Sequence, residues 1–295
     1  MAQAYEHDFA MERRLRMLNP ALHRRFTDAV FSLQHILSNY KLLFPQYTDH
    51  SELHSLNVID FCNRLIGTQI ERMNADEIYV LLMGCYFHDT GMGITEKDFL
   101  QFSQDIDFGD YFETHSREDL QQTIRDFHNE FSGRFIRKYA DFFEIPSNEH
   151  LWAIIEVSRG HRKTSLMNET EFPLSMPVAG GNKICLPYLS ALIRLADELD
   201  VSAARNSALL YDIHSITAEN SILEFSKHNS IRDMLMLPDR FLLKVTTQEP
   251  ELMEKIRTMV GKMQHTLDDC RLAVMTRTPY IITQERIEIQ DAEQE

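Results

Sequence analysis

Apolar residues recur at intervals of three and four along most of the first two thirds of the chain, which is the spacing of helices buried on one face. The least polar segment, residues 78–87, is apolar on nearly all sides and predicts a helix at the centre of a bundle. Asn74 and Glu77 form a capping-box pattern before it, and Gly91 is expected to supply the left-handed residue after its end. This part of the chain therefore predicts a helical bundle.

Further amphipathic helices are expected around the central one. The pattern predicts a long helix over 117–143 with a bend at 132–133, a helix over 147–160, and another that begins after Pro187. The proline- and glycine-containing stretch 163–187 predicts a long loop between the last two helices. Because both flanking helices carry candidate ligands, this loop is a candidate substrate lid.

The pattern changes after about residue 206. Short alternating segments predict strands, and a longer periodic segment predicts one more helix. The strands are expected at 216–227, 240–247 and 279–289, and the helix at 250–275. We therefore expect a mainly α protein, with a helical bundle over residues 1–206 and a small α+β appendage over 207–295. The appendage is expected to regulate the bundle, cover its site or support a homodimer.

Composition and charge narrow the class of protein. A hydrophobic content of 43% and a charged content of 25% are typical of a soluble globular chain. The net charge of −15 argues against non-specific binding to nucleic acid, so a phosphate ligand needs a local source of positive charge. The four cysteines are far apart, which predicts neither a disulfide framework nor a cysteine zinc site. With no signal-peptide pattern and no apolar run of membrane-spanning length, we expect a cytoplasmic protein without membrane contact.

The first candidates for a functional site are His88 and Asp89, which directly follow the central apolar helix. An ionised carboxylate in such a place is unfavourable unless it is hydrogen-bonded, ion-paired or bound to a metal. A hydrogen-bonded core pair is the alternative to a metal site. Other imidazole and carboxylate groups occur on the surrounding helices. They are His54, His128, His161 and Asp197. Each alone is more often a core or surface residue than a ligand, but together they favour a common site.

This series of residues resembles the signature of the HD-domain metal-dependent phosphohydrolase superfamily, in which a His, a His-Asp pair and a distal Asp lie on a helical bundle. The two additional histidines make it similar to the H…HD…H…H…D subclass, which includes the HD-GYP cyclic-dinucleotide phosphodiesterases. The similarity covers roughly residues 45–206 and is most specific at HDTGM (88–92) and RLADELD (194–200). No GYP signature follows a histidine, and Met92 stands where many relatives have lysine, so specificity for cyclic di-GMP is not implied.

The resemblance implies two divalent ions. One would be held by His54, His88, Asp89 and Asp197, and the other by His128, His161 and the bridging Asp89. Imidazole and carboxylate ligands suit iron or manganese best, with zinc, magnesium, cobalt and nickel as alternatives. Two such ions would lower the pKa of a bridging water and give a hydroxide that attacks phosphorus. His88 and Asp89 are the residues expected to carry catalysis.

Several flanking residues are candidates for supporting roles. His50 is expected to bind either a metal or the substrate, and Asp200 to orient a ligand histidine. Arginine and lysine near the ligands suit phosphate oxygens, although exposed ion pairs are their more common role. The phosphate-binding candidates are Arg162, Lys163, Arg194 and Arg205.

The favoured hypothesis is a metal-dependent phosphohydrolase that cleaves a small phosphorylated substrate such as a nucleotide, as a monoesterase or a diesterase. A one-metal nucleotidase that uses His54, His88, Asp89 and Asp197 is the first alternative. The second is a catalytically silent module that binds a nucleotide or docks a partner. Metal content per chain separates the two enzymes, and the intact ligand set argues against the silent module.

Overall fold

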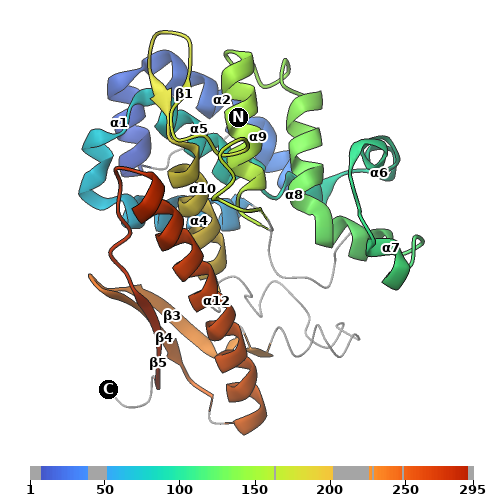
Figure 1. Ribbon diagram of the computed structural model, residues 1–295, viewed down its shortest axis with the longest axis vertical. Helices are drawn as coiled ribbons and strands as arrows, with labels where there is room; N and C mark the ends of the chain where they lie inside the picture. Colours follow the sequence, from blue (N-terminus) through green and yellow to red (C-terminus); the bar gives the residue numbers. More distant parts are fainter. Residues whose placement is uncertain are drawn as a thin grey trace, which may run out of the picture.

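The computed structural model describes residues 8–38, 52–162, 164–201, 226–227, 229–247 and 249–291. Within these ranges the protein is mainly helical, and a bundle is followed by a long helix and a small sheet (Figure 1). This arrangement confirms the expected fold class. The division into domains at residues 206 and 207 stays a prediction, because 202–225 lie outside the described residues.

Helix α5 (Ala75–Phe87) is the core of the bundle, and every one of its residues is buried. The Asn74 side chain accepts hydrogen bonds from the backbone N–H groups of Asp76 and Glu77, while the Glu77 carboxylate accepts from the Asn74 N–H, so the predicted capping box is present. Five helices pack around α5. They are α1 (Ala10–Leu18), α2 (Pro20–Ser38), α4 (Glu52–Ile66), α9 (Asn148–Arg159) and α10 (Leu186–Leu199). A 3-10 turn, η1 (Gly67–Arg72), follows α4.

The long helix expected over 117–143 is observed as α8 (Leu120–Lys138). Its break lies at Phe127, where φ is −121° and ψ is 16°, so the bend expected at 132–133 is wrong. The Phe127 ring packs edge-on against Phe108 and Tyr111, with centroids 4.9 and 5.0 Å away, and these contacts favour the kink. The chain leading into α8 forms α6 (Glu96–Phe102), η3 (Ser103–Asp105) and α7 (Tyr111–Thr114).

The loop between α9 and α10 contains a two-stranded hairpin, β1 (Met176–Pro177) and β2 (Lys183–Ile184). The Asn182 side chain donates a 2.7 Å hydrogen bond to Asp76 at the start of α5. Arg277 donates to the Phe172 carbonyl at 2.8 Å and so fastens a second part of the loop. The loop is therefore tied to the bundle through Asp76 and to the C-terminal part through Arg277, and its use as a substrate lid stays a prediction.

The C-terminal part holds a three-stranded sheet in the order β3-β4-β5 (Figure 1). The strands are β3 (Ile231–Met236), β4 (Arg240–Val245) and β5 (Arg286–Asp291). Strand β3 is antiparallel to β4, whereas β5 is parallel to β4 and is reached through α12 (Pro250–Arg277), which also packs on α10.

Two of the C-terminal predictions, the strand at 240–247 and the helix at 250–275, are confirmed. The final strand begins at Arg286 rather than at 279, and β3 was not expected. In the segment before β5, the Tyr280 ring stacks on Tyr188 of α10 with centroids 4.0 Å apart, and this packing holds the segment out of the sheet. The strand expected at 216–227 lies almost entirely outside the described residues.

The four cysteines are all buried as free thiols. Across the described ranges, no helix combines the length and the apolar character that a membrane crossing requires.

Candidate metal centre

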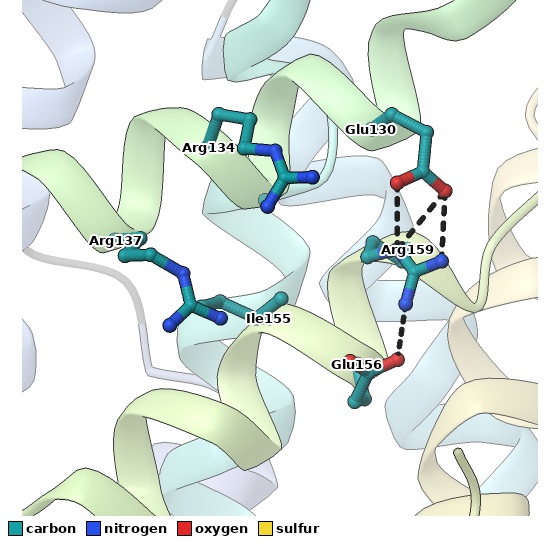
Figure 2. Close-up of a pocket in the computed structure, with 7 residues that line it drawn as sticks. Glu130, Arg134, Arg137, Ile155, Glu156 and Arg159 are labelled. Atoms are coloured by element: carbon teal, nitrogen blue, oxygen red, sulfur yellow. Dashed lines mark hydrogen bonds and ion pairs between the residues drawn. The ribbon is translucent and has the colours of Figure 1, made fainter. Parts of the chain in front are cut away.

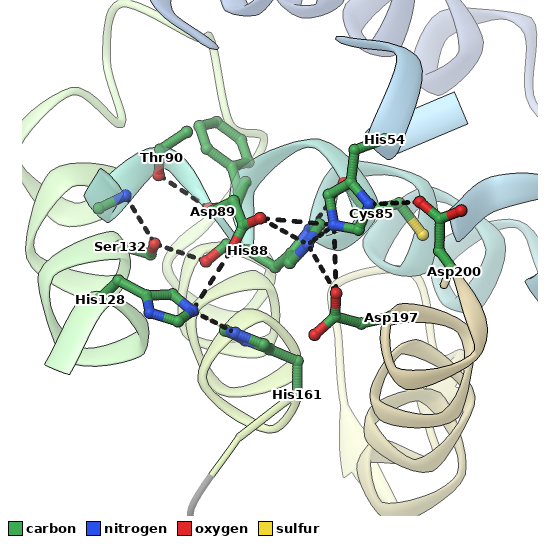
Figure 3. Close-up of polar contacts among 12 residues, drawn as sticks. His54, Cys85, His88, Asp89, Thr90, His128, Ser132, His161, Asp197 and Asp200 are labelled. Carbon is green, nitrogen blue, oxygen red and sulfur yellow. Dashed lines mark hydrogen bonds and ion pairs between the residues drawn. The ribbon is translucent and has the colours of Figure 1, made fainter. Parts of the chain in front are cut away.

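The six predicted ligands converge inside the bundle (Figure 3). His54 lies in the first turn of α4, His88 caps the carboxyl end of α5, and Asp89 follows directly. His128 lies one residue after the kink in α8, and His161 lies just beyond the end of α9. Asp197, in the last turn of α10, is the most exposed of the six, with 26% of its side chain accessible. The site therefore opens to solvent on the side of Asp197.

The first two histidines have their ring orientation set by oxygen atoms behind them. His54 Nδ1 lies 2.7 Å from Asp200 Oδ2, and His88 Nδ1 lies 2.9 Å from the carbonyl oxygen of Cys85. Because these oxygens accept, each Nδ1 carries the proton and each Nε2 presents a lone pair. The two Nε2 atoms lie 3.1 Å apart and form the first imidazole pair.

The second imidazole pair repeats this arrangement. His128 Nδ1 donates to the Arg125 carbonyl at 2.7 Å, and His161 Nδ1 donates to the Ser158 carbonyl at 2.5 Å. The two Nε2 atoms face each other at 2.9 Å. Burial lowers the pKa of His128 well below its usual value, and burial together with the nearby His88 lowers the pKa of His161 to about 4. Both rings are therefore neutral near pH 7, the form in which imidazole binds metals.

Asp89 connects the two pairs. Its Oδ2 lies 3.4 Å from both His54 Nε2 and His88 Nε2. Its Oδ1 lies 3.3 Å from His128 Nε2. One carboxylate oxygen thus faces each pair. The donor atoms form two groups, each within 4.8 Å, that share this residue: His54, His88 and Asp89, and Asp89, His128 and His161.

Asp197 completes the first group from the solvent side. Its Oδ1 lies 3.1 Å from His54 Nε2 and 3.9 Å from His88 Nε2. Burial alone would raise the pKa of Asp197, but the close approach of the His54 and His88 rings holds it far below its usual range. The carboxylate is therefore ionised.

The residues fit a divalent metal by both chemistry and geometry. Two facing lone pairs repel each other unless a positive charge lies between them. The Nε2 atoms lie 3.1 Å apart in the first pair and 2.9 Å apart in the second, close enough for each pair to hold one ion. Neutral imidazoles and ionised carboxylates are ligands of borderline divalent ions. These buried groups are therefore suited to hold divalent metal ions.

The turn after α5 is pressed against α8. The Ser132 hydroxyl donates to the His88 carbonyl at 2.6 Å and accepts from the Gly91 N–H at 2.8 Å. A Cβ atom at Gly91 would overlap the His128 carbonyl oxygen and would lie 2.8 Å from the Ser132 nitrogen. The left-handed conformation expected at Gly91 is wrong, since this residue lies in a 3-10 turn, η2 (Thr90–Gly93), without positive φ. Glycine is needed there for close backbone approach.

Asp200 lies where a residue that orients His54 would be expected. Besides its contact with His54 Nδ1, it accepts a 3.1 Å hydrogen bond from the Asn57 side chain through Oδ1. It is almost fully buried at the end of α10. Both of its oxygens are thus engaged, and Oδ2 contacts the ring nitrogen of His54 that faces away from His88.

The predicted phosphate-binding residues are placed differently from one another. Arg162 lies beside the second pair, with one guanidinium nitrogen 3.3 Å from both the Arg125 carbonyl oxygen and His128 Nδ1. Arg194 instead donates to backbone oxygens of the turn that carries His161. His50, Lys163 and Arg205 lie outside the described residues. The roles predicted for these residues in binding metal or phosphate stay predictions.

Two charged groups near the site were not anticipated. Figure 2 shows Arg159 between Glu130 and Glu156, with bonds of 2.9 Å to Glu130 and 2.7 Å to Glu156. This contact joins α8 to α9 two residues from His128 and from His161. Next to Asp197, the pKa of Glu198 is raised by burial and by the Asp197 charge, and three cations offset only part of this rise. They are Arg162, Lys262 and Lys227. Each group brings together residues that are far apart in the chain, so no local sequence pattern indicates that they meet.

The helical bundle and its buried histidine–aspartate groups define an HD-domain protein, and together they support a metal-dependent hydrolase of this type. A family model, HD-CE, matches residues 44–269, and the chain therefore belongs to the HD-CE family. Searches of curated proteins and of solved structures found no match. The finer assignment to the H…HD…H…H…D subclass stays a prediction.

Proposed function

We propose that the protein is a two-metal phosphohydrolase that cleaves a nucleotide or a related small phosphoester. The observation that carries this proposal is the position of Asp89, whose two oxygens face different imidazole pairs. A carboxylate placed in this way can be shared by two neighbouring ions, as the two-metal reaction needs them close together. A one-metal site would leave His128 and His161 buried with facing lone pairs and no ion between them.

The residues of the chain have separate parts in the proposed reaction. His54, His88 and Asp197 would hold one ion, and His128 and His161 the other, with Asp89 shared. Bound divalent ions would neutralise phosphate charge and lower the pKa of a water, so that it can attack phosphorus near neutral pH.

Substrate would enter from the side of Asp197, the most exposed ligand. Arg162, Lys227 and Lys262, whose charges act on the neighbouring Glu198, would attract the phosphate. They offer a local positive field in a chain of net charge −15. Iron or manganese remains the expected metal, and a small phosphorylated molecule the expected partner. A cytoplasmic location, a homodimer and the absence of non-specific nucleic-acid binding remain predictions.

The test combines metal analysis with a substrate screen. The protein is purified with and without air, its metal content per chain is measured, and mono-, di- and cyclic nucleotides are offered with the metal found. We expect about two ions per chain and hydrolysis of at least one substrate class. One ion in a fully loaded sample would favour the one-metal nucleotidase instead. Full metal loading without turnover of any phosphoester would favour the silent binding module.

A matched pair of variants assigns the activity to this site. Asp89→Asn should lose metal and turnover while remaining a folded helical protein by circular dichroism, because Asp89 belongs to both of the described donor groups. Asp98→Asn is the control, since Asp98 pairs with Lys138 at 2.7 Å on the outer side of α8. Wild-type turnover in Asp89→Asn would remove Asp89, and with it the proposed site, from the reaction.

A further inference from the structure

Arg194 fastens the turn that carries His161. From α10 its Nε donates to the Gly160 carbonyl at 2.7 Å. One terminal nitrogen donates to both the carbonyl and the hydroxyl of Thr164, each at 2.8 Å. The two ends of the turn, on either side of His161, are therefore held by one guanidinium group. Arg194 forms no ion pair in the part of the chain that the structure describes, and its hydrogen bonds go to two backbone carbonyls and one hydroxyl of this turn.

This turn needs an external support because His161 lies outside regular structure. Helix α9 ends at Arg159, and Gly160 is its C-cap. The other three histidines lie within a helix or at its cap, where the helical backbone limits their position. Within its own segment of the described chain, the His161 ring is oriented by a single hydrogen bond, from its Nδ1 to the Ser158 carbonyl. Its distance from His128 therefore depends on how the turn sits against α10.

The contact between the turn and α10 is close as well as hydrogen-bonded. A Cβ atom at Gly160 would lie 2.6 Å from Ser190 Cβ and 2.7 Å from Ser190 Oγ. Arg194 lies one helical turn after Ser190 and about one turn before Asp197 along α10. The same helix thus presents Asp197 to the first imidazole pair and sets the position of His161 in the second.

The chemistry of the contact requires arginine. A planar guanidinium carries donors in a fixed fork and can reach two separate acceptors, whereas an ammonium is a single point of charge. Burial lowers the pKa of Arg194, and the nearby Cys270 and Asp269 act in the opposite direction. A buried cation that makes three hydrogen bonds to one turn is expected where that turn must be held in place.

We propose that Arg194 is a positioning residue that holds His161 at the distance from His128 which the second ion requires. This inference rests on the two-metal function proposed above. It replaces phosphate binding as the main role of Arg194.

The experiment measures the binding of each ion by titration of the metal-free, full-length protein with Mn²⁺. Arg194→Met keeps an unbranched side chain and removes the donors. It should lower the affinity for the second ion by about 10- to 100-fold, the range typical of residues that support a metal ligand. The affinity for the first ion should stay within about threefold of the wild-type value. Hydrogen exchange at residues 160–164 should rise at the same time. Arg194→Lys should restore part of the lost affinity, and it serves as the test if the methionine variant does not fold.

Arg277→Met is the matched control. Arg277 also binds backbone carbonyls of the same loop, those of Leu166 and Phe172, but it does not contact the turn around His161. It should lower the melting temperature and leave both ions bound. Unchanged binding of two ions in Arg194→Met would overturn the role of Arg194 and leave the proposed function intact. A wild-type protein that binds only one ion would overturn the two-metal site and this role together.

Discussion

Single residues behind the ligands decide which ring nitrogen faces the centre. The acceptor at Nδ1 is a carboxylate for His54 and a carbonyl three residues earlier for each of the other three histidines. A backbone carbonyl is present whatever the side chains are. Asp200 is therefore the one acceptor of the four that a substitution can remove.

Asp200→Asn should lower the affinity for the first ion by about tenfold. The reason is that an amide is a weaker acceptor for the Nδ1 proton of His54 and carries no negative charge. Mn²⁺ titration measures the effect. Asp60→Asn on the exposed side of α4 is the control and should bind as the wild type does. Equal affinity in both variants would show that Asp200 has no part in orienting His54.

Gly91→Ala tests the close approach between the turn after α5 and α8. The added methyl group would overlap the His128 carbonyl and the Ser132 nitrogen, both backbone atoms that cannot rotate away. We expect a loss of roughly 3 kcal/mol in the free energy of unfolding, measured by urea titration.

Gly261→Ala, within helix α12, is expected to stabilise the protein, in contrast to Gly91→Ala. Apart from the neighbouring backbone of α12 itself, nothing lies within 4 Å of the added group, so this variant should gain roughly 0.5–1 kcal/mol. If Gly91→Ala were as stable as the wild type, the packing of the turn against α8 would be wrong.

At the scale of elements, buried polar contacts fix how the helices meet. Arg159 joins α8 to α9 through Glu130 (Figure 2). Asp76 joins three elements: its Oδ1 lies 2.7 Å from His150 Nε2 on α9, and its Oδ2 accepts from Asn182 in the hairpin at 2.7 Å. Burial alone would raise the pKa of Asp76, but these hydrogen bonds lower it below its usual range.

The lowered pKa of Asp76 predicts a loss of stability in acid. The folded state binds the proton more weakly than the unfolded state does, so the contribution is complete above the ordinary aspartate pKa of about 3.9 and is lost as the pH falls through the lower folded value. Asp76→Asn should cost about 3 kcal/mol at pH 6 because it breaks a buried pair.

The difference between wild type and Asp76→Asn should shrink steadily in urea unfolding below about pH 4. Asp28→Asn, at an exposed i,i+4 pair, is the control and should change stability by less than about 0.5 kcal/mol at any pH. A difference that is independent of pH would show that the Asp76 carboxylate is not the source of the stability.

At the scale of the whole molecule, α12 and the segment after it bind the C-terminal part to the bundle. Helix α12 packs on α10, and Tyr280 stacks on Tyr188 of the same helix. Because α10 also carries Arg194 and Asp197, the C-terminal part supports the helix that contributes to both imidazole pairs. The HD-CE match over residues 44–269 likewise extends past the bundle into α12.

The sequence alone predicted the parts that depend on local rules. The apolar run of α5, its capping box and the helical periods were readable because each depends on residues a few positions apart. The six ligand candidates were readable because their order along the chain resembles the HD-domain signature. The α12 helix and strand β4 followed from the same periodic signals.

Tertiary structure decided what depends on residues far apart in the chain. The kink lies where the Phe127 ring packs against Phe108 and Tyr111, and Gly91 is required by the backbone of α8 rather than by its own turn. Arg194 is committed to Gly160 and Thr164, contacts that no local pattern encodes. Sequence determines which groups are present and which face of a helix carries them. Only packing determines the distances between them, because those distances are set by contacts between elements.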